Sequence, residues 1–245
     1  MLKFRMLLAI DAGNSSVKFG LFDGKKLKKS WTIKTCNLKS FKPSKDIKNM
    51  PAVVSSVVPS ADIILKKKLK RVHFVTALAM KKTIRIKVKH LSEIGADRIV
   101  NALAAKELFE LPAVIIDFGT ATTFDVVSKN GEYLGGLIAP GIGLSRDILH
   151  KATAKLPLIE IKPPKNIIGR STVDAMRSGL VFGYAAMVEG VVKRLKKELG
   201  NQVKVIATGG FAKMIGKYTA LIDIIDMDLT LKGLNLIWRK NYLNS

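Results

Sequence analysis

Short apolar runs separated by turn residues are the main pattern along this chain, and they predict a mixed α/β fold. Leu7–Ile10 is apolar and ends at Asp11, after which Val17 and Phe19 alternate with polar residues. This pattern predicts a buried strand, a tight turn and a second, half-buried strand. In the rest of the first half we expect strands over 27–33, 51–58, 72–75 and 83–89, and helices over 60–70, with Ser60 as the N-cap, and over 93–105.

The second half repeats the alternation of strands and helices. Residues 112–116 form an apolar run, and Asn130-Gly131 predicts a hairpin reversal. The stretch 135–143 is so rich in glycine that we expect no regular element there, but a backbone that approaches a ligand closely. We expect helices over 144–154 and 168–199, and a last buried strand over 203–207 that ends in a glycine turn.

The first hairpin has a second copy in the chain. Ile116–Thr123 repeats the order of Ile10–Val17, an apolar strand that ends in Asp-x-Gly and is followed by hydroxyl or amide residues. One such turn is ordinary hairpin chemistry, so two unrelated hairpins remain an alternative. Two copies in register favour two similar halves that offer polar turns to one cleft. We therefore expect one half over 1–110 and the other over 111–245.

The turn of the first hairpin has the composition of a phosphate site. Its residues are small, so backbone N–H groups and two hydroxyls can close on an oxyanion without steric cost; they are Gly13, Asn14, Ser15 and Ser16. Asp11 precedes the turn and is a candidate to hold hydrated Mg²⁺ through a water. Lys18 follows the turn and is a candidate to neutralise a phosphate oxygen.

A second candidate for chemistry lies at the start of the helix expected after residue 93. In the segment Gly95–Arg98, Asp97 stands next to the basic residue Arg98 in the first helical turn. A carboxylate there is also explained by the helix dipole, and an Asp–Arg pair is often only a surface couple. The residues alone leave both interpretations open.

The strong positive charge raises the question of a nucleic-acid partner. The formal net charge is +23 at pH 7 in 245 residues. The lysine clusters lie beside turns or amphipathic segments, without interleaved aromatic residues or a recognition-helix signature, so solvated surfaces are favoured over a nucleic-acid interface. Such a field would still raise the local concentration of anionic small molecules.

The composition also argues against disulfides, thiolate metal sites and membrane-spanning segments. Cys36 is the one cysteine, so a disulfide framework and a thiolate metal cluster are not expected. No segment approaches the roughly 20 apolar residues that span a bilayer. The apolar run near the N-terminus is too short for the core of a signal peptide, and we therefore expect a cytoplasmic protein without a membrane partner.

Taken together, the motifs resemble those of the type III pantothenate kinases, members of the acetate and sugar kinase, Hsp70 and actin superfamily. Asp11–Lys18 looks like the first phosphate motif of that family, Gly95–Arg98 like its pantothenate motif, and Asp117–Thr122 like its second phosphate motif. The resemblance spans most of the chain. One departure is Val88, which stands where many members have a tyrosine that contacts pantothenate.

The resemblance implies an α/β fold of the duplicated RNase H-like (actin-like ATPase) type, with two mixed-sheet halves around a central nucleotide cleft. It also implies transfer of the γ-phosphate of ATP to the primary hydroxyl of pantothenate, the first step of coenzyme A biosynthesis. Mg²⁺ would accompany ATP, and K⁺ or NH₄⁺ would be a further cofactor.

Residue roles follow from the same resemblance. Asp97 becomes the general base. Pantothenate contacts are implied for Gly95, Ala96, Asp97, Arg98 and Thr172, with Thr172 contributed by the neighbouring subunit of a homodimer. ATP contacts are implied for Asp11, Gly13, Asn14, Ser15, Ser16, Lys18 and Thr120, and Asp117 matches the ligand of the monovalent cation.

Two alternatives remain. The family includes proteins first described as accessory factors for transcription, so a regulatory relative with a nucleic-acid or protein partner is one of them. The other is a kinase for a different small alcohol.

Overall fold

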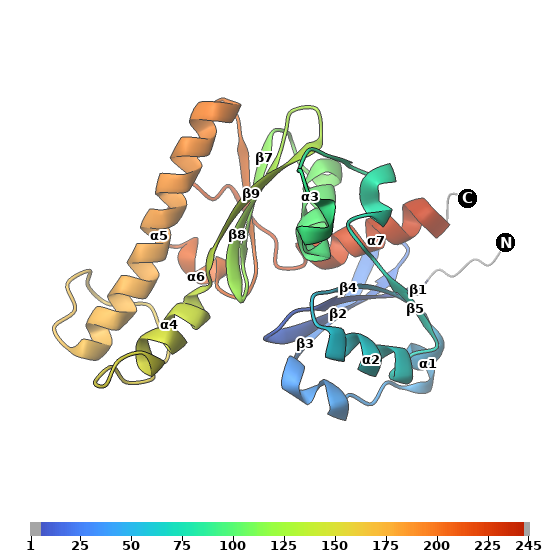
Figure 1. The fold of residues 1–245 in the computed structure, drawn as a ribbon, viewed down its shortest axis with the longest axis horizontal. Coiled ribbons are helices and arrows are strands. Elements are labelled where there is room, and N and C mark those ends of the chain that lie inside the picture. The colour runs from blue at the N-terminus through green and yellow to red at the C-terminus, as the bar shows by residue number, and fades with distance from the viewer. Residues whose placement is uncertain (1–5, 243–245) are drawn as a thin grey trace. The chain divides into compact units, whose positions relative to one another are not determined.

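The computed structural model describes residues 6–242, and its two units contain β-sheets of the same topology (Figure 1). In spatial order, the strands of the first unit's sheet are β3 (Lys26–Lys34), β2 (Ser16–Asp23), β1 (Met6–Ala12), β4 (Pro51–Ser56) and β5 (Arg71–Phe74). Those of the second unit are β9 (Glu132–Pro140), β8 (Ala121–Val127), β7 (Ala113–Phe118), β10 (Lys204–Thr208) and β11 (Ile224–Ile225). In both, the first three strands form an antiparallel meander and the last two run parallel to the strand before them. The repeated hairpin of the sequence is thus the start of two equivalent sheets.

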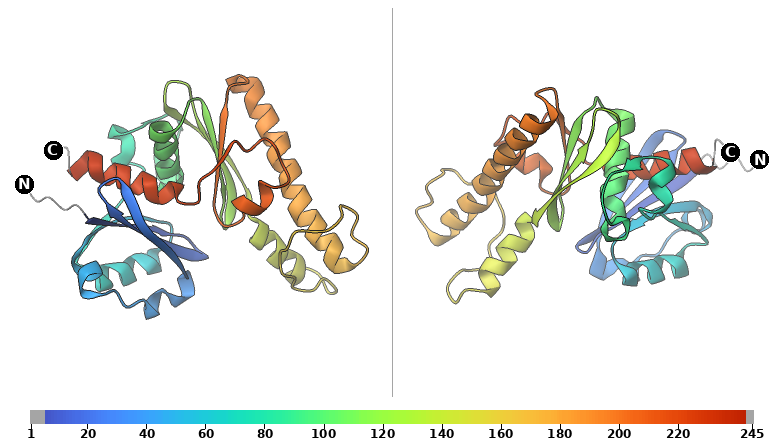
Figure 2. Two further views of the ribbon diagram at one scale, coloured as in Figure 1. Left: turned by 180° about the vertical axis from the view of Figure 1, so that it is seen from behind. Right: turned by 45° about the horizontal axis from the view of Figure 1, so that its top comes forward.

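The two compact units do not divide the chain at a single point. One unit contains the residues up to Leu108 together with the segment from Asp228, and the other contains Phe109–Met227. The division into halves 1–110 and 111–245 stays a prediction. The last helix, α7 (Leu229–Tyr242), packs against α3 (Ala96–Leu108) within the first unit, as both views of Figure 2 show.

In the first unit, helices cover both faces of the sheet. One face packs on the segment η1 (Thr35–Ser40), α1 (Lys45–Asn49) and α2 (Pro59–Lys68), through a core that contains Leu38 and Leu65. On the other side α3 and α7 contact β4, and α7 also contacts β1. The two helices approach closely, because a Cβ at Gly233 would lie 2.5 Å from the carbonyl oxygen of Val100.

In the second unit, one long helix provides most of the cover. Helix α5 (Thr172–Leu199) buries Leu180, Val181 and Val188 in a core that includes Val114 and Ile116 of β7. The remaining elements are short; they are η2 (Ala79–Lys82), β6 (Arg85–Ile86) and η3 (Leu91–Glu93) in the first unit, and α4 (Ile142–Lys151) and α6 (Ala212–Ile215) in the second. None of the helices in the described range 6–242 has the length and apolar character needed to cross a membrane.

The glycine-rich stretch after residue 134 was the clearest wrong prediction, because it lies largely in strand β9. Val126 pairs with Gly135 and Val127 with Tyr133, so Leu134 is an extra residue in the ladder. Gly135 adopts a φ of +107° there. Glycine accepts this backbone conformation, and the ladder continues on both sides of the resulting bulge.

Two other elements differ from the sequence prediction. The strand expected over 83–89 is reduced to β6, because the N–H groups of Thr83 and Ile84 both donate to the carbonyl of Met80 and close a helical turn. Ser60 is not the N-cap of α2; Pro59 occupies the first turn and the cap position is Val58. Proline suits that position, since its missing N–H would have had no partner in the helix.

Candidate functional site

The first phosphate motif forms the tight turn between β1 and β2. The N–H of Gly13 donates to the carbonyl of Ser16 at 3.0 Å and closes the turn. Asn14 and Ser15 at its tip are exposed, and Asp11 lies at the end of β1, paired with Lys18 across the hairpin. The turn therefore presents small polar groups at the end of a buried strand.

Lys18 has a partner that the sequence did not indicate. Its Nζ lies 3.0 Å from Oδ1 of Asp228, and both side chains are partly buried. Asp228 directly precedes α7, far from Lys18 in the sequence. No local motif could have revealed this pair, because it depends on the return of the chain to the first unit.

The pantothenate motif forms the start of α3, where Asp97 is held by the backbone. Oδ1 of Asp97 accepts a hydrogen bond from the N–H of Arg98 at 2.9 Å. Burial raises the pKa of the Asp97 carboxyl above its ordinary value, while the Arg98 N–H and the charge of its guanidinium act in the opposite direction. A carboxylate with a raised pKa binds a proton more readily, which suits a general base.

Gly95 leaves the space that the Asp97 carboxylate occupies. A Cβ at position 95 would overlap Oδ1 of Asp97 and lie 3.6 Å from Cγ1 of Val57. The glycine of this motif is therefore explained by close approach to the carboxylate rather than by a turn conformation.

A cavity of about 340 Å³ opens beside Gly95 and Ala96. Its wall is mainly apolar, and its lining residues are Ser56, Val57, Val75, Thr76, Ala77, Leu78, Leu91, Ser92, Ile94, Gly95 and Ala96. The N–H of Val57 donates to the carbonyl of Ala12 at 3.1 Å, so the cavity wall is tied to the end of β1. Since β1 and β4 are parallel, their carboxyl ends lie at one edge of the sheet, the usual place for ligands in such folds.

In the second unit, the second phosphate motif occupies the position equivalent to the first. Asp117 of β7 pairs with Thr208 of β10, as Asp11 of β1 pairs with Ser55 of β4. A Cβ at Gly209 would lie 2.5 Å from Oδ1 of Asp117, and Gly209 has a φ of +88°. The backbone of the glycine turn is thus pressed against the carboxylate.

The backbone of Thr120 is hydrogen-bonded to the loop before α4. The N–H of Gly141 donates to its carbonyl oxygen at 3.0 Å, and a side chain at Gly141 would collide with that carbonyl. The hydroxyl of Tyr184 on α5 donates to the carbonyl of Pro140 at 2.6 Å. Gly141 belongs to the glycine-rich stretch whose backbone was expected to approach a ligand, and here it supports Thr120 instead. Tyr184 is a supporting residue to which the sequence analysis gave no role.

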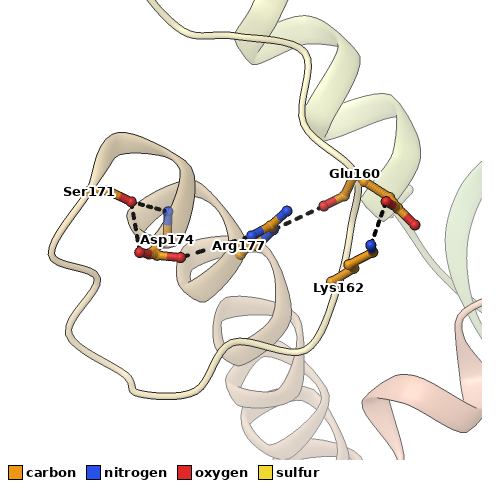
Figure 3. A network of polar contacts seen from close by, with 5 residues as sticks. All are labelled: Glu160, Lys162, Ser171, Asp174 and Arg177. Atoms are coloured by element: carbon orange, nitrogen blue, oxygen red, sulfur yellow. Dashed lines mark hydrogen bonds and ion pairs between the residues drawn. The ribbon is translucent and has the colours of Figure 1, made fainter.

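Thr172 is the first residue of α5, and it is exposed. Figure 3 shows the polar network next to it. Oγ of Ser171 accepts from the N–H of Asp174 at 3.1 Å and caps the helix, and Nε of Arg177 donates to the carbonyl of Glu160 at 3.2 Å. The network fixes the start of α5.

The predicted site residues therefore fall into two groups. Those of the first phosphate motif and of the pantothenate motif lie in the first unit, on either side of Val57. Asp117, Thr120 and Thr172 lie in the second unit. Their assembly into one ATP site stays a prediction.

Comparison with known proteins gives the family. Residues 7–194 match the model of the type III pantothenate kinases. The chain belongs to the type III pantothenate kinase family. It is therefore an ATP-dependent kinase that acts on pantothenate, at the first step of coenzyme A biosynthesis. Type III pantothenate kinases from Halalkalibacterium halodurans and Syntrophus aciditrophicus are 42% and 43% identical to it, over 96% of this chain and 100% of each relative.

Solved structures confirm the predicted fold class of this pantothenate kinase. A Campylobacter jejuni protein assigned to the Baf family of transcriptional activators aligns with a TM-score of 0.65 and 22% identity, over 96% of this chain and 98% of that one. An inorganic polyphosphate/ATP-glucomannokinase from an Arthrobacter strain aligns with a TM-score of 0.51 and 14% identity, over 97% and 99%. At these identities the likeness concerns the fold alone, a duplicated RNase H-like architecture.

Gly95→Ala tests the packing around Asp97. The added methyl group must displace the carboxylate, which is the end of a short side chain and can rotate away. On the predicted role of Asp97 as general base, we expect turnover to fall by about tenfold, since a small displacement of a reacting group is costly. Steady-state kinetics measures the turnover number, and thermal melting measures the stability of the variant. An unchanged turnover number would show that the position of this carboxylate does not matter.

Proposed function

We propose that Asp97 is the general base of the pantothenate kinase reaction. Its carboxylate accepts the proton of the primary hydroxyl as that oxygen bonds to the γ-phosphorus of ATP, and the bond to the β,γ-bridging oxygen breaks to release ADP. An alcohol is far too weak an acid to ionise at pH 7, so a carboxylate within hydrogen-bond reach is needed. The observation that carries the assignment is the partly buried position of Asp97, with a raised pKa, next to the Gly95–Ala96 wall of the cavity.

The cavity is the proposed pantothenate pocket. Its apolar walls suit the aliphatic part of the substrate, and the guanidinium of Arg98 suits an anionic or hydroxyl-bearing end. Gly95 and Ala96 border the cavity directly and Arg98 follows Asp97 on α3, so the four residues of the motif form one binding segment.

ATP contacts are assigned to the two phosphate motifs. In the first unit these are the groups at the end of β1 and in the following turn, namely Asp11, Gly13, Asn14, Ser15, Ser16 and Lys18; in the second unit it is Thr120. Phosphoryl transfer depends mainly on positioning and on neutralisation of charge, which N–H groups, hydroxyls and a lysine supply. The excess of positive charge attracts the anionic substrates.

The residues present fit a divalent ion that is bound largely through ATP. Among residues 6–242 there is no group of three or more His, Cys, Asp or Glu side chains that could hold a metal ion. Mg²⁺ in kinases is typically held by one or two carboxylates, waters and the phosphates. Asp11 would hold it through a water, and the ion supplies neutralisation of the phosphate charge.

Asp117 is the proposed ligand of a monovalent cation, K⁺ or NH₄⁺. The turn at Gly209 fits this role, because a side chain there would fill the space against Oδ1 of Asp117. Oxygen donors such as this carboxylate suit hard cations.

An assay of ADP release with pantothenate, in the presence and absence of K⁺ or NH₄⁺, tests this function. We expect turnover with pantothenate that depends on the cation, and loss of that dependence in Asp117→Asn. Turnover of a different alcohol would favour the kinase of another substrate. Salt-resistant binding of duplex DNA without turnover would favour a regulatory protein.

The second unit carries the surface that we assign to a homodimer. One side of α5 has exposed small residues, Ala175, Gly179, Gly183 and Ala186. Exposed apolar side chains lie nearby in sequence, on α4 and before α5; they are Leu144, Ile148, Ile167 and Ile168. In the dimer Thr172 at the start of α5 contacts pantothenate in the site of the partner.

Gly183→Trp should therefore produce a monomer that retains nucleotide binding but loses most of its turnover. A Cβ at this position has no atom within 4 Å, so the folded subunit has room for the larger side chain. Lys197→Trp, about four helical turns further along α5, is the matched control and should remain dimeric. Light scattering after size-exclusion chromatography measures the mass. A dimeric, fully active Gly183→Trp variant would exclude this interface.

A further inference from the structure

We propose that Thr35 is a positioning residue for the first phosphate loop, Gly13–Ser16. The inference rests on the proposed role of this loop in ATP binding and adds a residue outside the three motifs. Oγ1 of Thr35 donates to the carbonyl of Gly13 at 2.7 Å, and the backbone N–H of Thr35 donates to the carbonyl of Ser15 at 3.1 Å. One residue thus holds two of the carbonyl groups of the loop.

The strand register explains why Thr35 reaches the loop. Strands β2 and β3 are antiparallel, and Ser16 at the start of β2 pairs with Lys34 at the end of β3. Ser15 directly precedes β2 and Thr35 directly follows β3, so the two residues are neighbours where η1 begins. The hydroxyl of Thr35 then extends two residues further along the loop, to the carbonyl of Gly13.

The direction of these hydrogen bonds sets the direction of the loop amides. The peptide bond between Gly13 and Asn14 is trans, so the N–H of Asn14 points opposite to the carbonyl of Gly13. Because that carbonyl points to Thr35, the N–H of Asn14 points away from Thr35. Anion sites need N–H groups directed at the ligand and carbonyl groups directed elsewhere.

The glycine at position 13 is the reason why the orientation of this peptide has to be fixed. A peptide next to Gly13 can rotate at little steric cost, since glycine occupies both halves of the φ range. A rotated peptide would point the carbonyl of Gly13 at the phosphates, where two negative charge centres repel. The hydroxyl of Thr35 selects the orientation that binds phosphate before ATP arrives.

Three variants test the proposal. Thr35→Val removes the hydroxyl at nearly constant volume, Thr35→Ser retains it, and Thr32→Val makes the same chemical change at an exposed position of β3. For Thr35→Val we expect the KM for ATP to rise about tenfold, with the KM for pantothenate and kcat within about threefold of the wild type. Thr35→Ser and Thr32→Val should remain close to the wild type in all three constants.

Binding of a non-hydrolysable ATP analogue, measured by calorimetry, gives a readout that is independent of pantothenate. If the wild type binds the analogue but does not phosphorylate pantothenate, the proposed function fails and the affinity of Thr35→Val still tests the role of Thr35. A wild type that binds no nucleotide contradicts both proposals. If Thr35→Val is too unstable to assay, Thr35→Ala removes the same donor without the branched side chain.

Two results would overturn the role of Thr35. One is an unchanged affinity for the ATP analogue in a folded Thr35→Val or Thr35→Ala variant. The other is an equal loss of affinity for ATP and pantothenate that Thr35→Ser does not rescue, which is the behaviour of a residue that only stabilises the fold.

Discussion

Asp97→Asn should bind ATP normally and phosphorylate pantothenate at least about a hundred times more slowly than the wild type, the scale expected for general acid–base catalysis. The amide has the shape of the carboxylate and still accepts the hydrogen bond from the N–H of Arg98, so the start of α3 should keep its conformation. What it loses is the capacity to take a proton. Single-turnover kinetics and equilibrium binding of nucleotide measure the two properties separately.

The matched control for this variant is Glu93→Gln. It removes an exposed carboxylate four positions before Asp97, and we expect no change in turnover. A similar loss in both variants would point to the general electrostatic field rather than to a base. Undiminished turnover in Asp97→Asn would remove Asp97 from the mechanism.

The raised pKa of Asp97 also gives the sign of two pH effects. Only the ionised carboxylate can accept a proton, so the acid limb of kcat/KM should lie above the ordinary aspartate value of about 3.9 and should be absent in Asp97→Asn. Because burial favours the neutral form in the folded state, this group stabilises the fold at low pH. That contribution is lost as the pH rises from the pKa of the unfolded chain to that of the folded protein.

Gly209→Ala should lower both stability and cation-dependent activity. The residue has a φ of +88°, and a Cβ would lie 2.5 Å from Oδ1 of Asp117 and 2.6 Å from backbone atoms of Phe118. An unfavourable backbone conformation and overpacking each cost about 1–3 kcal/mol. A protein of this size should then melt roughly 5–15 °C lower. Thermal melting and a titration with K⁺ measure the two losses.

The neighbouring glycine provides the control for that experiment. A Cβ at Gly210 has no atom within 4 Å, so Gly210→Ala should melt close to the wild type. If the two alanine variants behave alike, the close packing of Gly209 on the carboxylate is not what matters at this turn.

The parts of the fold that could be predicted from the sequence are those with a local cause. The hairpins around Gly13 and Gly119 follow from apolar runs and small turn residues, and the duplicated motif pointed to two equivalent sheets. Strand β9 was missed because its glycines are accommodated by pairing with β8, which periodicity does not reveal. Helix α7 was also missed, although Leu231, Leu234 and Trp238 have helical spacing and are buried.

In the candidate site too, residues in local motifs could be predicted and residues that depend on tertiary structure could not. Asp11, Asp97 and Asp117 stand in motifs that a reader of the sequence can find. Asp228 and Thr35 act on the first phosphate motif from distant positions, and their contacts depend on how the chain returns to β1 and β2. Residues of this kind become visible only when strand register and helix packing are known.

The membership of α7 in the first unit has a consequence for biosynthesis. While the ribosome is making the protein, the amino-terminal sheet lacks one of its covering helices until the residues up to Tyr242 have emerged. The segment 109–227 is complete earlier, so we expect it to mature before the first unit, the reverse of the usual order in which amino-terminal parts mature first. A nascent chain arrested before residue 228 should therefore protect its middle segment from protease and leave its beginning open to cleavage.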